Sequence, residues 1–366
     1  MGSLARMVSP PSGGQQWRLR SPAATYYVDM GKVLSKKELE AAHCWEAGDR
    51  VPGRPEMTEF RRRLRYHQSQ WREAEGHPIG SQPIAPKPGG GAARLVGSRL
   101  PLAYARETGA NFLTAGALDA GEGSIVGQEP HQILGAQHVW ADLLWSTTMS
   151  YNLFGDLAAD LGLADRAVHT CWPDAPGTVC DVRFQHSPGR LDRAYIGNLS
   201  WFDAAFLLDL GDTTQGIIGL VTRYHERTQT REPKPSRLAR YVEVTERSGV
   251  FKPGAIDAVN GTDLLVMWLD HLLVLSMLQH PNRKWDWGRF VLVHPDANTD
   301  FADACNRYRD LLADPSTFSS MTVEELLDAR RPPGTHGRCA AQAVHPPLTP
   351  PRTRGSNDRV VLLSFR

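Results

Sequence analysis

The chain has 366 residues, 41% of them hydrophobic, and its 41 basic and 40 acidic residues give a formal net charge of +1. A single domain takes roughly 100–200 residues, so the length predicts two or three units, and the hydrophobic fraction excludes a chain that is disordered throughout. A net charge near zero excludes a globally basic nucleic-acid binder, so any basic surface must be a local patch.

The cysteines and the apolar runs narrow the class of protein further. The five cysteines are odd in number and form no CxxC pair, which argues against a zinc ribbon and against a secreted disulfide framework. No apolar stretch follows Arg6, so the N-terminus does not resemble a signal peptide. The most apolar run, residues 264–278, contains Asp270 and His271 and is shorter than a membrane span. We therefore expect a soluble, cytoplasmic protein without membrane contacts.

The two ends of the chain have compositions typical of loose segments. We expect residues 1–52 to be a loosely ordered leader, because residues 1–25 are rich in Gly, Ser, Pro and Gln. Residues 331–366 are rich in Pro and Arg and predict a mostly disordered tail, with one short extended piece at residues 360–365. Residues 84–91 (IAPKPGGG) are typical of a linker.

A helical N-terminal region is predicted over residues 53–136. Thr58 is placed to cap a basic helix that runs through Trp71 and carries Arg61, Arg62, Arg63, Arg65 and Arg72. A further helix is predicted at residues 138–161, with apolar side chains on one side. Two roles are open for the basic helix: it could bind a nucleic-acid backbone, or it could present a solvated face whose charge neighbouring glutamates balance.

The pattern changes to strands after residue 178. Strands are predicted at residues 179–186, 201–210 and 216–224, and the Gly211-Asp212 turn between the last two indicates a hairpin. Helices follow at residues 236–248 and 263–279, then a buried strand at 289–294 and helices at 299–312 and 322–330. This order of helix, three strands, helices, strand and helix predicts an α/β sandwich with a mixed sheet.

Several common catalytic motifs are absent from the sequence. The run Gly89-Gly90-Gly91 lacks the Gly-Lys-Ser/Thr ending of a phosphate-binding loop, and there is no GxSxG elbow or HExxH helix. The informative residue is Asp203, which lies inside an apolar strand. An acid buried in such a run must be paired or bound to a metal, so Asp203 is the first candidate for a functional residue.

Asp203 and the hairpin partner Val221-Thr222-Arg223-Tyr224-His225-Glu226 resemble the PD-(D/E)XK superfamily, the restriction-endonuclease-like nucleases. The resemblance extends over residues 57–330 and includes the strings Asn152-Leu153-Phe154-Gly155 and Arg183-Phe184-Gln185-His186-Ser187-Pro188-Gly189-Arg190. It implies a restriction-endonuclease-like core with the order α-β-β-β-α-β at residues 137–330. It also implies a Mg²⁺-dependent DNA endonuclease of bacterial type, acting in restriction, defence or DNA processing, with Asp203 as the first metal-binding acid.

The sequence departs from the family's acid-x-Lys triplet at both of its chemical positions. Val221 stands where the second acid belongs and Arg223 where the lysine belongs. Valine cannot ligate a metal, and arginine can stabilise phosphate charge but stays protonated and cannot act as a base. Either the acid has migrated, or the site is inactive and the fold survives as a nucleic-acid-binding or scaffolding module.

If the second metal-binding acid is supplied from another position in the sequence, two glutamates are candidates for this role. Glu243 on the following helix is the better geometric candidate, and Glu226 is nearer but needs a bend or bulge to join the face shared by Val221, Arg223 and His225. Asp181 on the first strand is a further possible metal ligand, although a solvated strand acid is the more probable role.

The remaining expectations concern the partner. The candidate nucleic-acid contacts are Arg61, Arg62, Arg65, His186, Arg190 and His225. A homodimer would suit two cuts on a duplex, an expectation that rests on analogy at the level of the fold.

Overall fold

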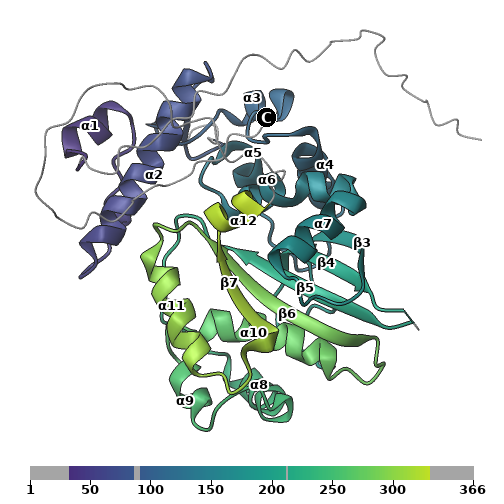
Figure 1. Ribbon diagram of the computed structural model, residues 1–366. Coiled ribbons are helices and arrows are strands. Elements are labelled where there is room, and N and C mark those ends of the chain that lie inside the picture. The colour runs from purple at the N-terminus through teal and green to yellow at the C-terminus, as the bar shows by residue number, and fades with distance from the viewer. Residues whose placement is uncertain (1–32, 86–90, 212, 330–366) are drawn as a thin grey trace, which may run out of the picture.

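A five-stranded mixed sheet lies at the centre of the computed structural model, which describes residues 33–85, 91–211 and 213–329 (Figure 1). The strands are β3 (Thr178–His186), β4 (Phe202–Asp209), β5 (Gln215–Thr222), β6 (Trp285–His294) and β7 (Phe318–Thr322). They lie in the order in which they occur along the chain. The pairs β3–β4 and β4–β5 are antiparallel, whereas β5–β6 and β6–β7 are parallel.

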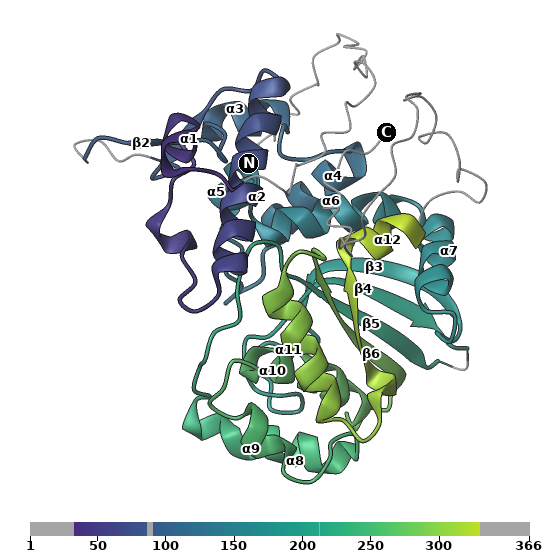
Figure 2. The same ribbon diagram turned by 60° about the vertical axis from the view of Figure 1, so that its left-hand side comes forward.

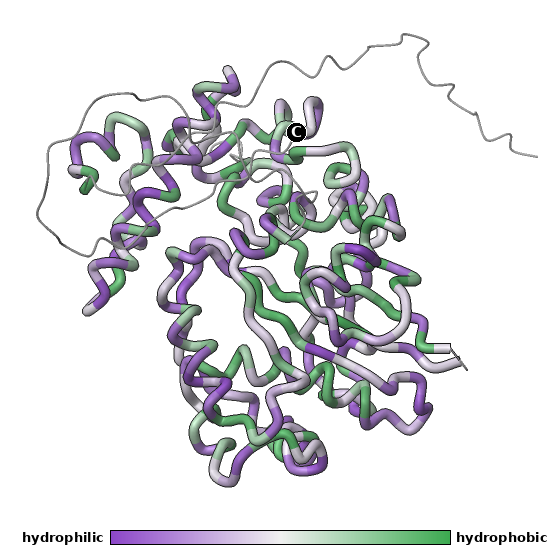
Figure 3. The backbone as a smooth tube through the Cα atoms, viewed as in Figure 1, coloured by the Kyte–Doolittle hydropathy of each residue, from purple (hydrophilic) through white to green (hydrophobic). Residues whose placement is uncertain are grey.

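Helices cover both faces of this sheet (Figures 1 and 2). On one face lie α8 (Pro235–Ser248), α9 (Ala255–Val259), α10 (Leu265–Leu278) and α11 (Thr299–Asp310). On the other lie α6 (Ser146–Ala159), α7 (Leu161–Cys171) and α12 (Val323–Ala329). In β4, Ala205 and Leu207 face the first group and Phe206 and Leu208 the second, because side chains alternate along a strand. Both faces are therefore buried, and Figure 3 shows the hydrophobic stretches of the chain running through the strands.

The segment before the sheet forms a largely helical region packed on the α6 side. It contains α1 (Lys36–Ala41), α2 (Pro55–Ala74), α3 (Leu102–Thr108), α4 (Ala115–Val126), α5 (Ala136–Ala141) and the two-stranded sheet of β1 (Gly80–Gln82) and β2 (Arg94–Val96). Phe60 and Leu64 of α2 are buried in the apolar cluster that also covers β4 and β5. The N-terminal region is thus part of the same core as the sheet.

Local sequence explains where the helices begin and end. Pro235 occupies the first turn of α8, and Gly249 ends that helix in the left-handed conformation at φ 66°. Ser35 and Glu38 form a capping box at the start of α1. α10 is apolar almost all round, which fits a helix buried against the sheet rather than one with a solvated face. None of the helices in the described ranges is long and apolar enough to cross a membrane.

The structure confirms the predicted α/β fold with a mixed sheet and flanking helices. One difference is that the helix expected at residues 138–161 is two helices, α5 and α6. Asp142 leaves the helix in an extended conformation, pairs with Arg99 through an isolated β-bridge and accepts a hydrogen bond from the Leu144 amide at 3.1 Å. Side-chain bonding to the backbone thus competes with the helix at this acid.

Other differences are at element ends and in polar segments. α2 begins at Pro55 rather than at Thr58, whose hydroxyl lies 3.2 Å from the Arg54 carbonyl. β7 was not predicted, because its sequence FSSMT lacks a strand pattern and it forms only by pairing with β6. Part of the expected leader carries α1, where Leu39 is fully buried. The expected tail and its extended piece at 360–365, and most of the expected linker, lie outside the described residues.

The contact between α4 and α6 depends on Gly155. A Cβ at Gly155 would lie 2.5 Å from the Ala117 backbone, whereas one at Gly123 on α4 would meet no atom within 4 Å. We therefore expect Gly155→Ala to lower the free energy of unfolding by about 1–3 kcal/mol, because backbone cannot move aside as a side chain can. Gly123→Ala is the matched control and should raise the free energy by up to about 1 kcal/mol through helix propensity. Urea unfolding measures both; equal effects would show that the helix contact is not this tight.

Candidate functional site

Asp203 lies at the start of β4, where the sheet meets α6 and α10. The register pairs Ala204 with Leu220, which places Asp203 opposite Val221 on the face that α10 covers. Both residues are buried, with 5% and 2% of their surface exposed. The strand β5 thus brings an apolar side chain to the position beside Asp203, where the sequence comparison predicted a degenerate triplet.

Both oxygens of the Asp203 carboxylate have donors within the chain. Oδ2 accepts the Thr222 amide at 2.8 Å and lies 3.1 Å from the Thr222 hydroxyl, and Oδ1 accepts the Gln185 amide nitrogen Nε2 at 3.3 Å. Burial raises the pKa of Asp203, while Arg223 and the bonds from Thr222 act in the opposite direction. The carboxylate is therefore held in place by its neighbours on β3 and β5.

Arg223 stands between two buried acids. Its Nη1 lies 4.0 Å from Oδ2 of Asp203, and its Nη2 lies 3.5 Å from Oδ2 of Asp270 on α10. Burial and the charge of Asp203 raise the pKa of Asp270 to about 7, against the opposing effect of Arg223. We refer to Asp203, Arg223 and Asp270 as the Arg223 triad. An arginine stays protonated under all ordinary conditions, so the triad carries its own fixed cation.

Glu226 belongs to a second set of contacts on the α6 side of the same site. Its Oε1 accepts the Ser146 hydroxyl, and its Oε2 accepts the Tyr224 amide at 2.7 Å. The Ser146 carbonyl in turn lies 3.1 Å from the Thr222 hydroxyl that contacts Asp203. Two residues, Thr222 and Ser146, thus connect Asp203 to Glu226.

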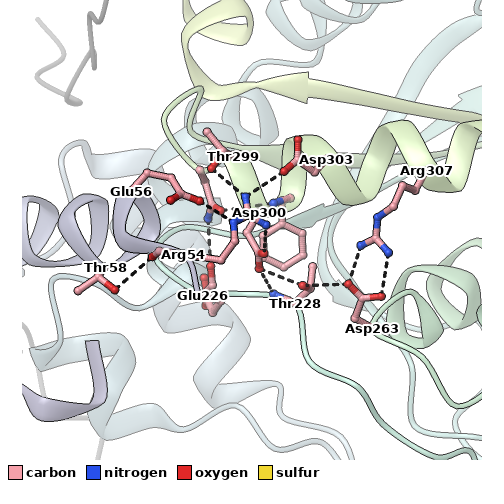
Figure 4. Close-up of polar contacts among 12 residues, drawn as sticks. Arg54, Glu56, Thr58, Glu226, Thr228, Asp263, Thr299, Asp300, Asp303 and Arg307 are labelled. Atoms are coloured by element: carbon pink, nitrogen blue, oxygen red, sulfur yellow. Dashed lines mark hydrogen bonds and ion pairs between the residues drawn. The ribbon is translucent and has the colours of Figure 1, made fainter. Parts of the chain in front are cut away.

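The loop after β5 is fixed from the other side by a clamp centred on Arg54 (Figure 4). Arg54, just before α2, pairs with Asp300 at 3.1 Å and Asp303 at 2.9 Å, both on α11. Asp300 also accepts the Thr228 amide at 2.6 Å. The clamp joins α2, α11 and the segment that carries Arg223 and Glu226, so the position of that segment depends on the N-terminal region.

The structure does not bring the other two predicted metal ligands to Asp203. Glu243 lies on the exposed side of α8, where its carboxylate pairs with Arg240 at 2.9 Å and Arg247 at 3.2 Å. Asp181 pairs with Arg183 at 2.7 Å. It lies four residues along β3 from Gln185, the neighbour of Asp203, a separation of roughly 13 Å at about 3.3 Å per residue.

The predicted basic patch on α2 is largely engaged in contacts within the chain. Arg65 binds Asp49 at 2.8 Å and Arg61 lies 3.7 Å from the same carboxylate, while Arg62 stacks over the Trp45 ring at 4.5 Å. His225 is near these arginines, and burial lowers its pKa, so its ring is neutral at pH 7. The three arginines connect α2 to Asp49 and Trp45, and a role of these four residues in nucleic-acid contact stays a prediction.

His186 and Arg190 lie together on the segment that leaves β3. Arg190 pairs with Glu129 and donates from Nη2 to the Gln185 carbonyl at 2.7 Å. Burial and the nearby arginines lower the pKa of His186 to about 4. Gln185, the last but one residue of β3, has a left-handed backbone at φ 50° and donates a hydrogen bond to Asp203.

The residues at this site do not fit a divalent metal ion. The Asp203 oxygens already accept hydrogen bonds, the position beside Asp203 is Val221, and the Arg223 guanidinium lies between the two acids. In the described ranges, no group of three or more His, Cys, Asp or Glu side chains is arranged to hold a metal. A Mg²⁺ site needs open oxygen ligands for octahedral coordination, and this arrangement supplies a cation in their place.

Sequence reasoning missed Asp270, Ser146 and Gln185. The signal for Asp270 was present, because a lone acid within the apolar run 264–278 needs a partner just as Asp203 does. Nothing in the sequence marks Ser146 or Gln185, since their roles depend on contacts 80 and 18 residues away along the chain.

The raised pKa of Asp270 predicts a pH dependence of stability. The folded protein holds this proton up to about pH 7, whereas the unfolded chain releases it near pH 4, so stability falls as pH rises between these values. The substitution Asp270→Asn removes the titrating carboxyl group and with it this fall in stability between pH 4 and pH 7. The free energy of unfolding of Asp270→Asn relative to wild type should therefore increase from pH 4 to pH 7, by about 1.4 kcal/mol for each pKa unit of the shift.

Asp263, beside the same helix, provides a control of opposite sign. Its pairing with Arg307 lowers its pKa, so it stabilises the fold above the ordinary aspartate pKa and loses that effect as pH falls. Asp263→Asn should therefore be destabilising at pH 7 and approach wild type in acid. Urea unfolding across this range measures both variants, and a pH-independent difference for Asp270→Asn would contradict the burial of its charge.

The comparisons with known proteins agree with this architecture. A family model described as the PD-(D/E)XK nuclease superfamily matches residues 55–345, which is most of the chain. Among curated proteins and among solved structures, none gives a significant match. The matched range includes the whole sheet, Asp203 and the Arg223 triad. The chain belongs to the PD-(D/E)XK nuclease superfamily.

Proposed function

We propose that this protein binds nucleic acid through a nuclease fold in which metal-dependent cleavage has been lost. The observation that carries the proposal is the position of Arg223. Its guanidinium lies between Asp203 and Asp270, and the side chain opposite Asp203 is that of Val221, at the position where the resemblance to the superfamily implies an acid. Phosphodiester hydrolysis by a metal needs a bound water of lowered pKa, and no group in the triad can generate one without the ion.

The low solvent exposure of the two acids also supports the loss of metal-dependent cleavage. Asp203 and Asp270 are 5% and 6% exposed, so their carboxylates face protein rather than solvent. A nuclease acting on a polymer must bring a phosphate oxygen to within coordination distance of a metal held by these acids. Both Asp203 oxygens already accept hydrogen bonds from Thr222 and Gln185, so a metal ion there would have to displace these donors.

We expect the binding partner to be a nucleic acid, because members of the superfamily act on nucleic acids. DNA is the form we expect, and the binding should not require a divalent ion. The homodimer and the cytoplasmic location expected from the sequence stay predictions.

The competing function is the Mg²⁺-dependent DNA endonuclease, acting in restriction, defence or DNA processing. The observation in its favour is that two further carboxylates, Glu226 and Asp270, belong to the contacts around Asp203. It would require Arg223 to move out of the space between Asp203 and Asp270.

Incubation with supercoiled plasmid separates the two functions. Purified protein with Mg²⁺, Mn²⁺ or EDTA should leave the plasmid uncut, because the triad lacks an open metal site. DNA should still be retarded on a gel, equally with EDTA and with Mg²⁺, apart from the general weakening that added salt causes.

Nicking that requires a metal and is lost in Asp203→Asn would overturn the proposal in favour of the endonuclease. The variants Asp270→Asn and Glu226→Gln would then identify the second acid, with Glu243→Gln as the matched control on the exposed side of α8. Absence of both cleavage and DNA binding would contradict both functions.

A further inference from the structure

A cavity of about 530 Å³ opens on the far side of Gln185 from Asp203. Its walls are the end of β3 and the small residues of α4 and α6, among them Gly123 and Ala158. Pockets for small organic groups have volumes of about 300–1,000 Å³, so the cavity is large enough for a nucleoside. Since Gln185 lines the cavity and also donates to Asp203, the cavity adjoins the Arg223 triad.

Polar groups without partners gather where β3 ends beside this cavity. Among the described residues, His186 Nε2, Ser187 Oγ and Arg190 Nε are buried and make no hydrogen bond. The Arg190 side chain is only 5% exposed, and its other nitrogens are fixed by Glu129 and the Gln185 carbonyl. Buried polar groups are nearly always bonded, and of these three residues His186 lines the cavity, so its ring nitrogen is the group that a ligand there would complete.

The charges around the cavity select an uncharged ligand group. Asp119, Glu129 and Arg183 stand at its wall, but Glu129 pairs with Arg190 and Arg183 pairs with Asp181, so this wall offers no unpaired cation that would attract a phosphate. His186 is neutral at pH 7 because burial lowers its pKa to about 4, so it offers a hydrogen bond rather than a positive charge. The cavity therefore suits a group that is polar at its edge but carries no charge.

The remaining wall offers a flat apolar surface and a free backbone edge. Phe184 lines the cavity and packs at its other side on Tyr151, with ring centroids 5.1 Å apart. Within the described ranges β3 is an edge strand that pairs with β4 alone, so its outward backbone groups are open to a ligand. A planar heterocycle with donors and acceptors along one edge matches both features, as when unpaired bases stack on aromatic side chains.

We propose that this cavity binds a single unpaired base of a nucleic acid, held between Phe184 and the small residues of α4, with His186 at its polar edge. The proposal rests on the nucleic-acid binding proposed above and assigns to it a preference for unpaired strands. A base in this cavity would leave its sugar-phosphate outside, where Arg183 is exposed.

Binding of fluorescein-labelled oligothymidylate of about 15 nucleotides tests this, with a duplex and an abasic strand of equal length as comparison probes and EDTA throughout. The single strand should bind at least about tenfold more tightly than the abasic strand, as expected for base stacking. Gly123→Leu, which fills the cavity from an open position, and His186→Phe, which keeps a ring without the hydrogen bond, should bring the affinity for the single strand close to that for the abasic strand.

Gly48→Leu is the matched control, because Gly48 is likewise open to an added side chain but lies outside the cavity. It should bind like wild type, and thermal unfolding confirms that all variants are folded. Unchanged nucleic-acid binding in Gly123→Leu and His186→Phe would overturn this inference and leave the proposed function intact. A cavity that accepts an extended peptide along β3 instead of a base would give this same result. No binding of any probe by wild type would overturn both.

Discussion

The pairing of the Arg223 guanidinium with two buried carboxylates is the interaction on which the account of this site depends. Asp203 and Asp270 come from β4 and α10, and each is nearly inaccessible to water. A buried charge is tolerated only when it is paired, and removing one partner of such a set costs about 3–5 kcal/mol. Loss of Arg223 would remove the only cation of the triad and raise the pKa of both acids further, so the triad both links β4 to α10 and offsets the charge of its carboxylates.

The surrounding fold places this cation beside the start of β4 and the end of β5. The hairpin of β4 and β5 sets Asp203 beside Val221, and α10 crosses the same face with Asp270 pointing at Arg223. Thr222 and Ser146 extend the site to Glu226, and the Arg54 clamp holds the loop that carries it (Figure 4). The sheet has the architecture of the superfamily, and we propose that Val221 and Arg223 stand where its triplet has an acid and a lysine.

Much of the fold could be predicted because strand alternation and turn signals mark the hairpin and the buried strand at 289–294 directly. Asp203 could be selected because an acid inside an apolar strand needs a partner. The second acid at Arg223 could not be predicted, since Asp270 lies 67 positions from Asp203 and only the packing of α10 brings both acids to Arg223. Glu243 seemed suitable on helix position alone, but the buried stripe of α8, with Tyr241 and Val244, turns Glu243 to solvent.

Divalent-ion titration of thermal unfolding tests the central claim, that Arg223 supplies the cation of this site, most directly. A ligand that binds only the folded state raises the melting temperature in a saturable way. We expect that Mg²⁺ and Mn²⁺ leave the melting temperature of the wild-type protein unchanged. We also expect that neither ion changes the melting temperature of Asp203→Asn. A saturable rise in wild type that disappears in Asp203→Asn would contradict the central claim, because the acids would then hold a metal that Arg223 does not exclude.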